Sequence, residues 1–308
     1  MHASILRILV LASALPALGQ NIIYETAFDS DLGWTLQGND QASWAVDGAP
    51  AIYRSPPFSL NFNDGVEIQE LGFPKEAIEQ YDKAILEDPE FASAYMNRGN
   101  AYDTLGEPER AIEDYDEAIR LDPQAVAYVN RGIAYDGLGQ LERAFEDYDE
   151  AIKLDPELAG AYYNRSILNA KKGEYQFAVE DLDRVIQLNP GDAQAYMNRG
   201  FVRDNLGQPE MALENYNEAI RLSPRFAMAY VNRSIVYLDM GNNEGAVDDL
   251  TVAIRIDPQL TQAYASRVIA YTLLGRDTEA EQDLVRLEDL GFGRAMLDAE
   301  VARIKAAR

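Results

Sequence analysis

The chain has 308 residues, enough for two ordinary domains, and a formal net charge of −25, which disfavours binding to the phosphate backbone of nucleic acids. It contains no cysteine, which excludes disulfides, thiol nucleophiles and thiolate zinc sites, and its one histidine is His2. Because the remaining chain lacks the commonest general base and the commonest transition-metal ligand, we expect no enzyme activity, no metal and no cofactor.

Residues 1–19 have the pattern of a secretory signal peptide. Arg7 precedes an apolar stretch over 8–18, and small residues at Ala17 and Gly19 predict cleavage before Gln20. The alternative is an uncleaved apolar N-terminal helix. No later apolar stretch approaches the ~20 residues that a membrane span needs. We therefore expect an exported protein, periplasmic, cell-envelope or secreted, with no membrane span after cleavage.

Residues 20–64 alternate aromatic and β-favouring residues with turn formers, which favours short strands. This texture resembles the opening of a secreted β-sandwich module, but a complete sandwich needs roughly 100 residues, so we interpret it as a fragment. Trp34 and Trp44 could stack on sugar rings, although core positions are favoured. Four candidate calcium ligands lack the spacing of a dedicated loop and fit turns better. These are Asp29, Asp31, Asn39 and Asp40.

Residues 65–291 form a repeat. A Tyr-x-(Asn/Ser)-Arg motif occurs six times, at Tyr95, Tyr128, Tyr162, Tyr196, Tyr230 and Tyr264. Prolines mark the same period: Pro89, Pro123, Pro156, Pro190, Pro224 and Pro258. They are 34 residues apart, except that Pro156 follows after 33. A period of this length indicates stacked supersecondary units that share one long surface.

Each unit predicts two antiparallel helices. In residues 92–123 the stripe of a first helix lies at i, i+4 and i+7, namely Tyr95, Gly99 and Tyr102. After a turn at Gly106, Pro108 suits the first turn of a second helix. The stripe of that helix consists of Ala111, Tyr115, Ala118 and Ile119. Neither helix pair can bury its stripe alone, so each needs its neighbours.

These positions resemble the tetratricopeptide repeat family. Its pattern is matched by Tyr95, Arg98, Gly99, Tyr102, Ala111, Tyr115 and Pro123. The resemblance implies an all-α, right-handed superhelical solenoid of antiparallel helix pairs, preceded by the short β-type fragment. Half a repeat and six repeats occupy residues 65–291, and an amphipathic capping helix follows at 292–308. Departures from the pattern predict looser packing of the later helix pairs; they are Ser166, Asn169, Arg203, Ser234 and Val268.

The resemblance also implies that the first helices line a concave groove, with the Asn of each motif pointing into it. A carboxamide donates and accepts hydrogen bonds, as recognition of a peptide backbone requires. The alternative is that these asparagines cap helices or face water. The predicted peptide-binding groove consists of Asn97, Asn130, Asn164, Asn198, Asn232, Met96, Val129, Tyr163, Met197, Val231, Asn100 and Phe201.

Charged residues are expected at the edge of this groove. The acidic ones are Asp103, Asp136, Asp204 and Asp239, and the basic ones are Lys171 and Arg203. Their balance favours neutral to basic extended peptides. Members of the family that clamp a C-terminal carboxylate carry Lys or Arg where this chain has Met, Val and Tyr. We therefore expect no carboxylate clamp.

The Arg of each motif is better explained by structure than by a ligand. An Asp follows five of the six arginines after sixteen residues, which predicts ion pairs within one helix pair. The pairs are Arg98 and Asp114, Arg131 and Asp147, Arg165 and Asp181, Arg233 and Asp249, and Arg267 and Asp283, while Arg199 precedes Asn215. Each pair would contribute about 0.2–1 kcal/mol if partly exposed.

The sequence thus predicts a non-catalytic scaffold that binds a protein or peptide segment in the groove. The alternative is a carbohydrate- or cell-surface-binding protein in which residues 20–64 recognise the ligand and the repeats act as a spacer. The sequence specifies neither the partner nor an oligomeric state.

Overall fold

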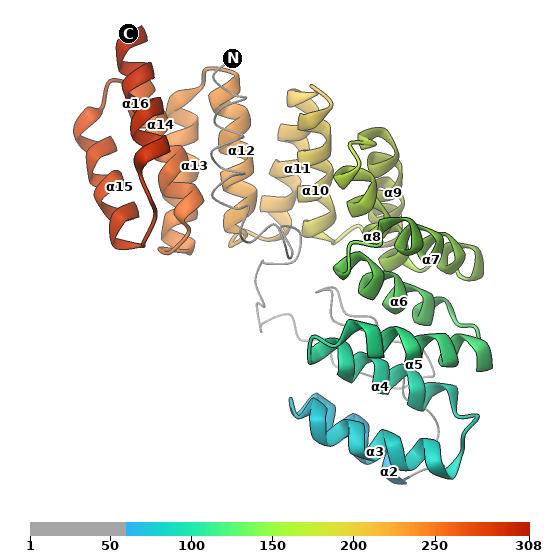
Figure 1. Ribbon diagram of the computed structural model, residues 1–308. Coiled ribbons are helices and arrows are strands. Elements are labelled where there is room, and N and C mark those ends of the chain that lie inside the picture. Colours follow the sequence, from blue (N-terminus) through green and yellow to red (C-terminus); the bar gives the residue numbers. More distant parts are fainter. Residues whose placement is uncertain (1–59) are drawn as a thin grey trace. The chain divides into compact units, whose positions relative to one another are not determined.

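The computed structural model describes residues 60–308, and every regular element in this range is an α-helix (Figure 1). These residues form two compact units, 60–188 and 189–308. The predicted signal peptide at 1–19 lies outside the described residues, as does the β-type fragment up to residue 59. The expected all-α array is therefore confirmed for the part of the chain that the structure describes.

Unit 60–188 consists of four helix pairs. Within a pair the helices are joined by a short turn through a glycine with positive φ, such as Gly106 at 72°, and this turn makes the two helices antiparallel. The second helix of each pair packs against the first helix of the next. The helices are α2 (Leu60–Glu70), α3 (Pro74–Glu87), α4 (Ala92–Thr104), α5 (Pro108–Leu121), α6 (Ala125–Gly137), α7 (Leu141–Leu154), α8 (Ala159–Lys171) and α9 (Tyr175–Leu188).

Unit 189–308 consists of three helix pairs and a last single helix. The helices are α10 (Ala193–Asn205), α11 (Pro209–Leu222), α12 (Ala227–Asp239), α13 (Asn243–Ile256), α14 (Thr261–Leu273), α15 (Asp277–Asp289) and α16 (Ala295–Ala307). The final helix packs against α14 and buries Leu297, Val301 and Ile304. These residues form the apolar stripe expected of a capping helix, since an array end needs one packed and one solvated side.

The start of the array differs from the sequence prediction. Helix α2 begins at Leu60, so the boundary predicted between residues 64 and 65 lies inside this helix. Phe62 is buried, with ring centroids 5.9 Å from Tyr81 and 4.7 Å from Phe91. Phe62 and Val66 lie at i and i+4 and form the buried stripe of α2. Residues 60–64 therefore belong to the first helix pair.

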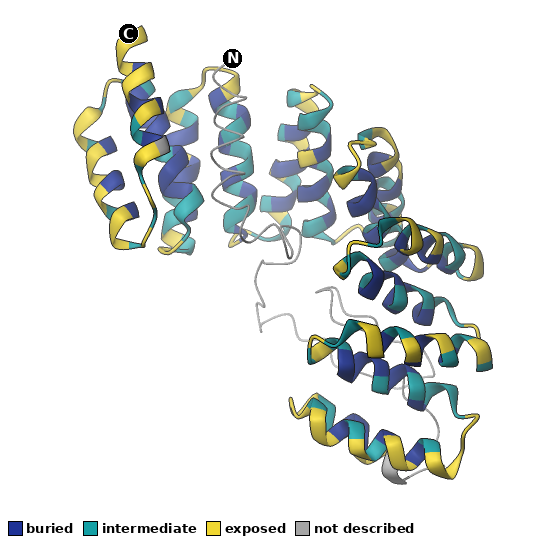
Figure 2. Ribbon diagram, in the orientation of Figure 1, coloured by how far each residue is buried: buried dark blue, intermediate teal, exposed yellow. Residues whose placement is uncertain are grey.

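Helices turn their buried sides toward their neighbours (Figure 2). Each close approach within a pair depends on a small residue in the first helix. A Cβ added to Gly132 would lie 2.6 Å from Cε1 of Tyr148, and one added to Gly99 would lie 2.7 Å from Cε1 of Tyr115. Contacts below 3.0 Å are not tolerated without movement, so the tyrosine ring requires glycine opposite it.

Pairs without this glycine also lack the tyrosine. The first-helix residues are then Ser166, Ser234 and Val268, and the residues sixteen positions later are Leu182, Leu250 and Leu284. All three leucines are fully buried. A larger first-helix residue is thus matched by a smaller partner, so these pairs are closed by different side chains and the prediction of looser packing is not supported.

Candidate peptide-binding face

First helices of successive pairs contact one another within each unit. Their shared surface carries the predicted groove residues, and one to two turns further along the same helices it carries Asp103, Ile133, Asp136, Lys171, Asp204, Ile235 and Asp239. We call this combined set of side chains the first-helix face.

Most of the predicted groove residues are buried. The buried ones are Met96, Asn97, Asn100, Val129, Asn130, Asn164, Met197, Asn198 and Val231. Tyr163 and Asn232 are half-buried, and Phe201 is 37% exposed. The asparagines therefore do not form a row of exposed carboxamides. Neighbouring first helices approach each other at this level, and the side chains between them fill the contact.

In unit 60–188, two of these carboxamides hydrogen-bond to each other. Nδ2 of Asn130 on α6 donates to Oδ1 of Asn100 on α4 at 2.9 Å. The same Oδ1 accepts from the hydroxyl of Tyr115 on α5 at 2.8 Å. The network joins three helices of two successive pairs. These carboxamides therefore form contacts between repeats, a use that the sequence interpretation assigned to a ligand.

Asp103 lies at the end of this network. The hydroxyl of Tyr115 is also 3.3 Å from Oδ2 of Asp103. Burial raises the pKa of Asp103 from 3.8 to about 6, while the hydrogen bond from Tyr115 acts in the opposite direction. This carboxyl group thus changes its charge near neutral pH rather than well below it.

A second acidic residue of the same unit is paired across repeats. Nζ of Lys171 on α8 lies 2.8 Å from Oδ1 and 2.7 Å from Oδ2 of Asp136 on α6. This ion pair offsets the charge of Asp136. The first-helix face of unit 60–188 is therefore less acidic than a count of its aspartates indicates.

Unit 189–308 presents a different surface. Nδ2 of Asn232 on α12 lies 3.1 Å from Sδ of Met197 on α10, which places these two side chains between the helices. One turn further along, Phe201 is exposed and Ile235 is half-buried. After another turn, Asp204 is half-buried and Asp239 is exposed. The accessible part of this face thus lies beyond the asparagines, toward the carboxyl ends of the helices.

The predicted ion pairs within the helix pairs are confirmed. Nε of Arg131 donates to Oδ2 of Asp147 at 2.9 Å, and Nη2 donates to Oδ1 at 2.6 Å. The same two-bond geometry occurs between Arg98 and Asp114, Arg165 and Asp181, Arg233 and Asp249, and Arg267 and Asp283. Arg199 donates to Oδ1 of Asn215 at 2.7 Å.

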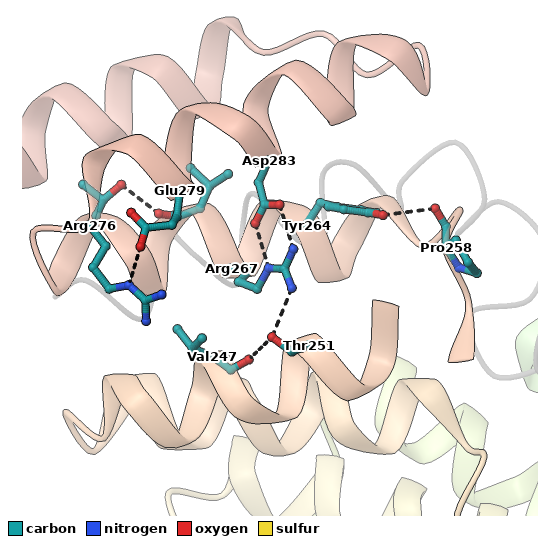
Figure 3. Close-up of polar contacts among 10 residues, drawn as sticks. Val247, Thr251, Pro258, Tyr264, Arg267, Arg276, Glu279 and Asp283 are labelled. Carbon is teal, nitrogen blue, oxygen red and sulfur yellow. Dashed lines mark hydrogen bonds and ion pairs between the residues drawn. The ribbon is translucent and has the colours of Figure 1, made fainter. Parts of the chain in front are cut away.

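The third nitrogen of each such guanidinium bridges to the preceding helix pair. Nη1 of Arg131 lies 2.5 Å from Oδ1 of Asp116, and Nη1 of Arg267 lies 3.0 Å from Oγ1 of Thr251 (Figure 3). The other bridging partners are Asp82 for Arg98, Asp149 for Arg165 and Asn217 for Arg233. Sequence reasoning missed these bridges, although a polar residue recurs 15 or 16 positions before each arginine.

The arginines are therefore committed to the structure. The guanidinium carbon of Arg131 lies 5.4 Å from the ring centroid of Tyr128, and its side chain is only 19% exposed. Burial raises the pKa of Asp147, and the hydrogen bonds from Arg131 oppose that rise. Guanidiniums with three occupied donor directions tie each pair to the one before it, so they are poor candidates for ligand contacts.

Two further searches concern residues 60–308 only. None of these helices is both long and apolar enough to cross a membrane. No three or more Asp or Glu side chains in this range are grouped so that they could hold a metal ion.

Repeated, stacked pairs of antiparallel helices define a helical repeat protein. Family models described as tetratricopeptide repeat match residues 92–124, 125–158 and 193–226, and a second model of the same description matches 159–192 and 227–260. Together they cover residues 92–260 without a break, which is more than half of the chain. The chain therefore belongs to the tetratricopeptide repeat family.

Similar solved structures support this fold. A tetratricopeptide repeat protein from Parabacteroides merdae is 20% identical, with 80% of this chain and 97% of that chain covered and a TM-score of 0.61. YrrB, described as a TPR protein with an unusual peptide-binding site, is 29% identical, with 59% and 95% covered and a TM-score of 0.51.

A third structure is a chain of the APC/C hetero-tetramer Cut9–Hcn1. It is 21% identical, with 68% of this chain covered and a TM-score of 0.59. This chain spans 42% of its length. No curated protein sequence matches the chain.

Proposed function

We propose that the chain is a non-catalytic protein-interaction scaffold that binds an extended peptide or protein segment on the first-helix face. The observation that carries this proposal is that the face leaves apolar and acidic side chains accessible on successive first helices. Ile133, Tyr163 and Ile235 are half-buried, and Phe201 is exposed. YrrB is similar to this chain over most of its own length and is described as having a peptide-binding site.

Binding would be additive along the face. Each hydrogen bond to a ligand backbone contributes about 0.5–1.5 kcal/mol net, so several helices must contribute for useful affinity. The buried asparagines of unit 60–188 already bond to protein groups, as Asn130 does to Asn100. Half-buried Tyr163 and Asn232 are better placed to meet a ligand. The favoured ligands are neutral to basic, because the face carries more acidic than basic side chains.

An unbiased peptide selection tests this function. Random peptides displayed on phage would be selected against the full chain and measured by calorimetry. We expect Tyr163→Ala or Ile235→Ala to weaken the selected peptides, and Glu113→Gln, an exposed change on second helix α5, to leave them unaffected. Selected peptides that respond only to changes on the second helices would contradict the proposal, as would a failure to select any peptide.

The alternative ligand-binding role of residues 20–64 has a different status. Only residues 60–64 of this segment are described, and they form part of α2. Their burial against the first pair supports a role in folding rather than in recognition.

We also propose that the protein is exported and that cleavage occurs before Gln20. The support is the apolar stretch over 8–18, followed by Gly19. N-terminal sequencing of the protein from the cell envelope or medium should begin at Gln20. An intact Met1 on protein recovered from the cytosol would overturn this proposal.

A further inference from the structure

An exposed aromatic ring lies beside acidic side chains on the first-helix face of unit 189–308. Phe201 on α10 is 37% exposed, which is unusual for a phenylalanine within a packed helix. The neighbouring first helix contributes half-buried Ile235 and exposed Asp239, and α10 itself contributes Asp204. We call these four side chains the Phe201 subsite.

Helix geometry places the four residues on one surface. Met197 and Asn232 contact each other between α10 and α12 at 3.1 Å, which marks the facing sides of the two helices. Phe201 and Asp204 follow Met197 at i+4 and i+7, so they continue the same side of α10. Ile235 and Asp239 follow Asn232 at i+3 and i+7 on α12. The apolar pair therefore lies between the helix contact and the two carboxylates.

The charge of this subsite distinguishes it from unit 60–188. There, Lys171 brings a positive charge to the first-helix face and bonds to Asp136. The same repeat slot, 34 and 68 residues later, holds Asn205 and Asp239. The motif arginines of these helices are engaged with second helices, as Arg233 is with Asp249 and Asn217. The local surface is therefore apolar with an acidic border.

Taken with the proposed function, on which this inference rests, these observations point to one class of ligand. We propose that the Phe201 subsite binds an extended peptide segment in which an aromatic or large aliphatic side chain is flanked by Lys or Arg. The apolar side chain packs against Phe201 and Ile235, which removes apolar surface from water on both partners. The flanking cations lie beside Asp204 and Asp239, and acidic segments are repelled.

Three synthetic peptides of equal length test the inference with the full chain. The first carries phenylalanine between pairs of lysines, the second carries phenylalanine between pairs of glutamates, and the third replaces the phenylalanine of the first by alanine. Fluorescence anisotropy should show that the first binds at least about 10-fold more tightly than either control, because each control removes one of the two contributions. Its affinity should also fall as salt is raised.

Two variants locate the binding. Phe201→Ala and Asp239→Asn should each weaken the lysine–phenylalanine peptide by about 5- to 30-fold, since each removes one contact of the subsite. Thermal unfolding should change little because both side chains are accessible. Ile133→Ala is the matched control: Ile133 occupies the repeat slot of Phe201 in unit 60–188 and should leave this peptide's affinity unchanged.

Specific results overturn the inference. They are equal binding of the glutamate-flanked peptide, undiminished binding by Phe201→Ala, or no binding by any of the three peptides. If selected peptides bind but respond to Ile133→Ala and not to Phe201→Ala, this inference fails while the proposed function stands. If the unbiased selection also finds no peptide, the proposed function fails with it.

Discussion

The two units use the same repeat but hold it together with different side chains. In unit 60–188, Arg98, Arg131 and Arg165 each lie between a buried Asp of their own helix pair and a second Asp of the preceding pair. In unit 189–308, the second partners of Arg233 and Arg267 are the neutral residues Asn217 and Thr251. The contact within a helix pair is thus retained, whereas the contact between pairs varies in charge.

The first-helix faces differ in the same sense. In unit 60–188, polar side chains of this face bond to each other, as Asn130 does to Asn100 and Lys171 does to Asp136. In unit 189–308, the corresponding level holds the soft contact of Asn232 with Met197 and the exposed ring of Phe201. A regular repeat therefore does not imply a uniform binding surface.

The largest expected effect separates the arginine bridges of the two units. Arg131→Met should lower the free energy of unfolding by about 3 kcal/mol, because Asp147 is left buried without its partner. This exceeds the value expected from partly exposed pairs, since the structure buries the aspartate. Arg233→Met should cost less, because its bridge partner Asn217 is neutral. Urea unfolding followed by circular dichroism measures both losses.

A double variant is the control for this prediction. Arg131→Met combined with Asp147→Asn should recover much of the loss, since it removes the uncompensated buried charge. Equal losses in the two single variants, or no recovery in the double variant, would show that these charges do not distinguish the units.

The closure of the helix pairs should behave alike in both units. Gly132→Ala and Gly200→Ala should each cost about 1–3 kcal/mol, because an added Cβ would overlap the ring of the facing tyrosine. The controls are Ser166→Ala and Ser234→Ala, where leucines face the first helix, and both should cost less. If Gly200→Ala were tolerated while Gly132→Ala was not, the units would differ in core packing as well as in their bridges.

The pH dependence of Asp103 should be confined to unit 60–188. Its pKa in the folded state is raised above 3.8 to about 6, so the folded protein binds the proton more tightly than the unfolded chain does. The contribution of this group to stability is therefore lost as pH rises from about 4 to about 6. Asp103→Asn should be more stable than the parent at pH 8, on the order of 1–2 kcal/mol, and the difference should vanish near pH 4.

Asp136→Asn provides the comparison for that measurement. It removes the ion pair with Lys171 and should give no stability gain at pH 8. Urea unfolding of the parent and the two variants at pH 4, 6 and 8 checks this. A pH-independent difference between Asp103→Asn and the parent would contradict the assignment.

The smallest expected effect concerns the asparagines. Helix propensity alone favours alanine, but Asn130→Ala should lower stability by about 0.5–1.5 kcal/mol because it removes the hydrogen bond to Asn100. Asn232→Ala should cost less, since its partner is the weak acceptor sulfur of Met197. Thermal denaturation of the two variants measures the difference, and an Asn130→Ala variant more stable than the parent would refute the structural role.

The fold of the described residues was predictable because its signals are local. Pro108 at the start of a helix, Gly106 in a turn and a tyrosine at each i, i+4 and i+7 stripe act over a few residues, and the period repeats them. The pairing of Arg131 with Asp147 was predictable for the same reason, since one short turn brings positions sixteen apart together. The start of α2 was missed because its stripe, Phe62 and Val66, is only two residues long.

Only the tertiary structure decided which side chains remain accessible. Asn97 and Phe201 both lie on first helices at predicted groove positions, yet one is completely buried and the other is 37% exposed. Their exposure depends on how closely the neighbouring helices approach and on the volumes of the side chains between them, which lie about a repeat apart in sequence. The second partners of the arginines depend on the same spacing. The sequence by itself thus determined the helices and their pairing, whereas packing between repeats determined the surface available to a ligand.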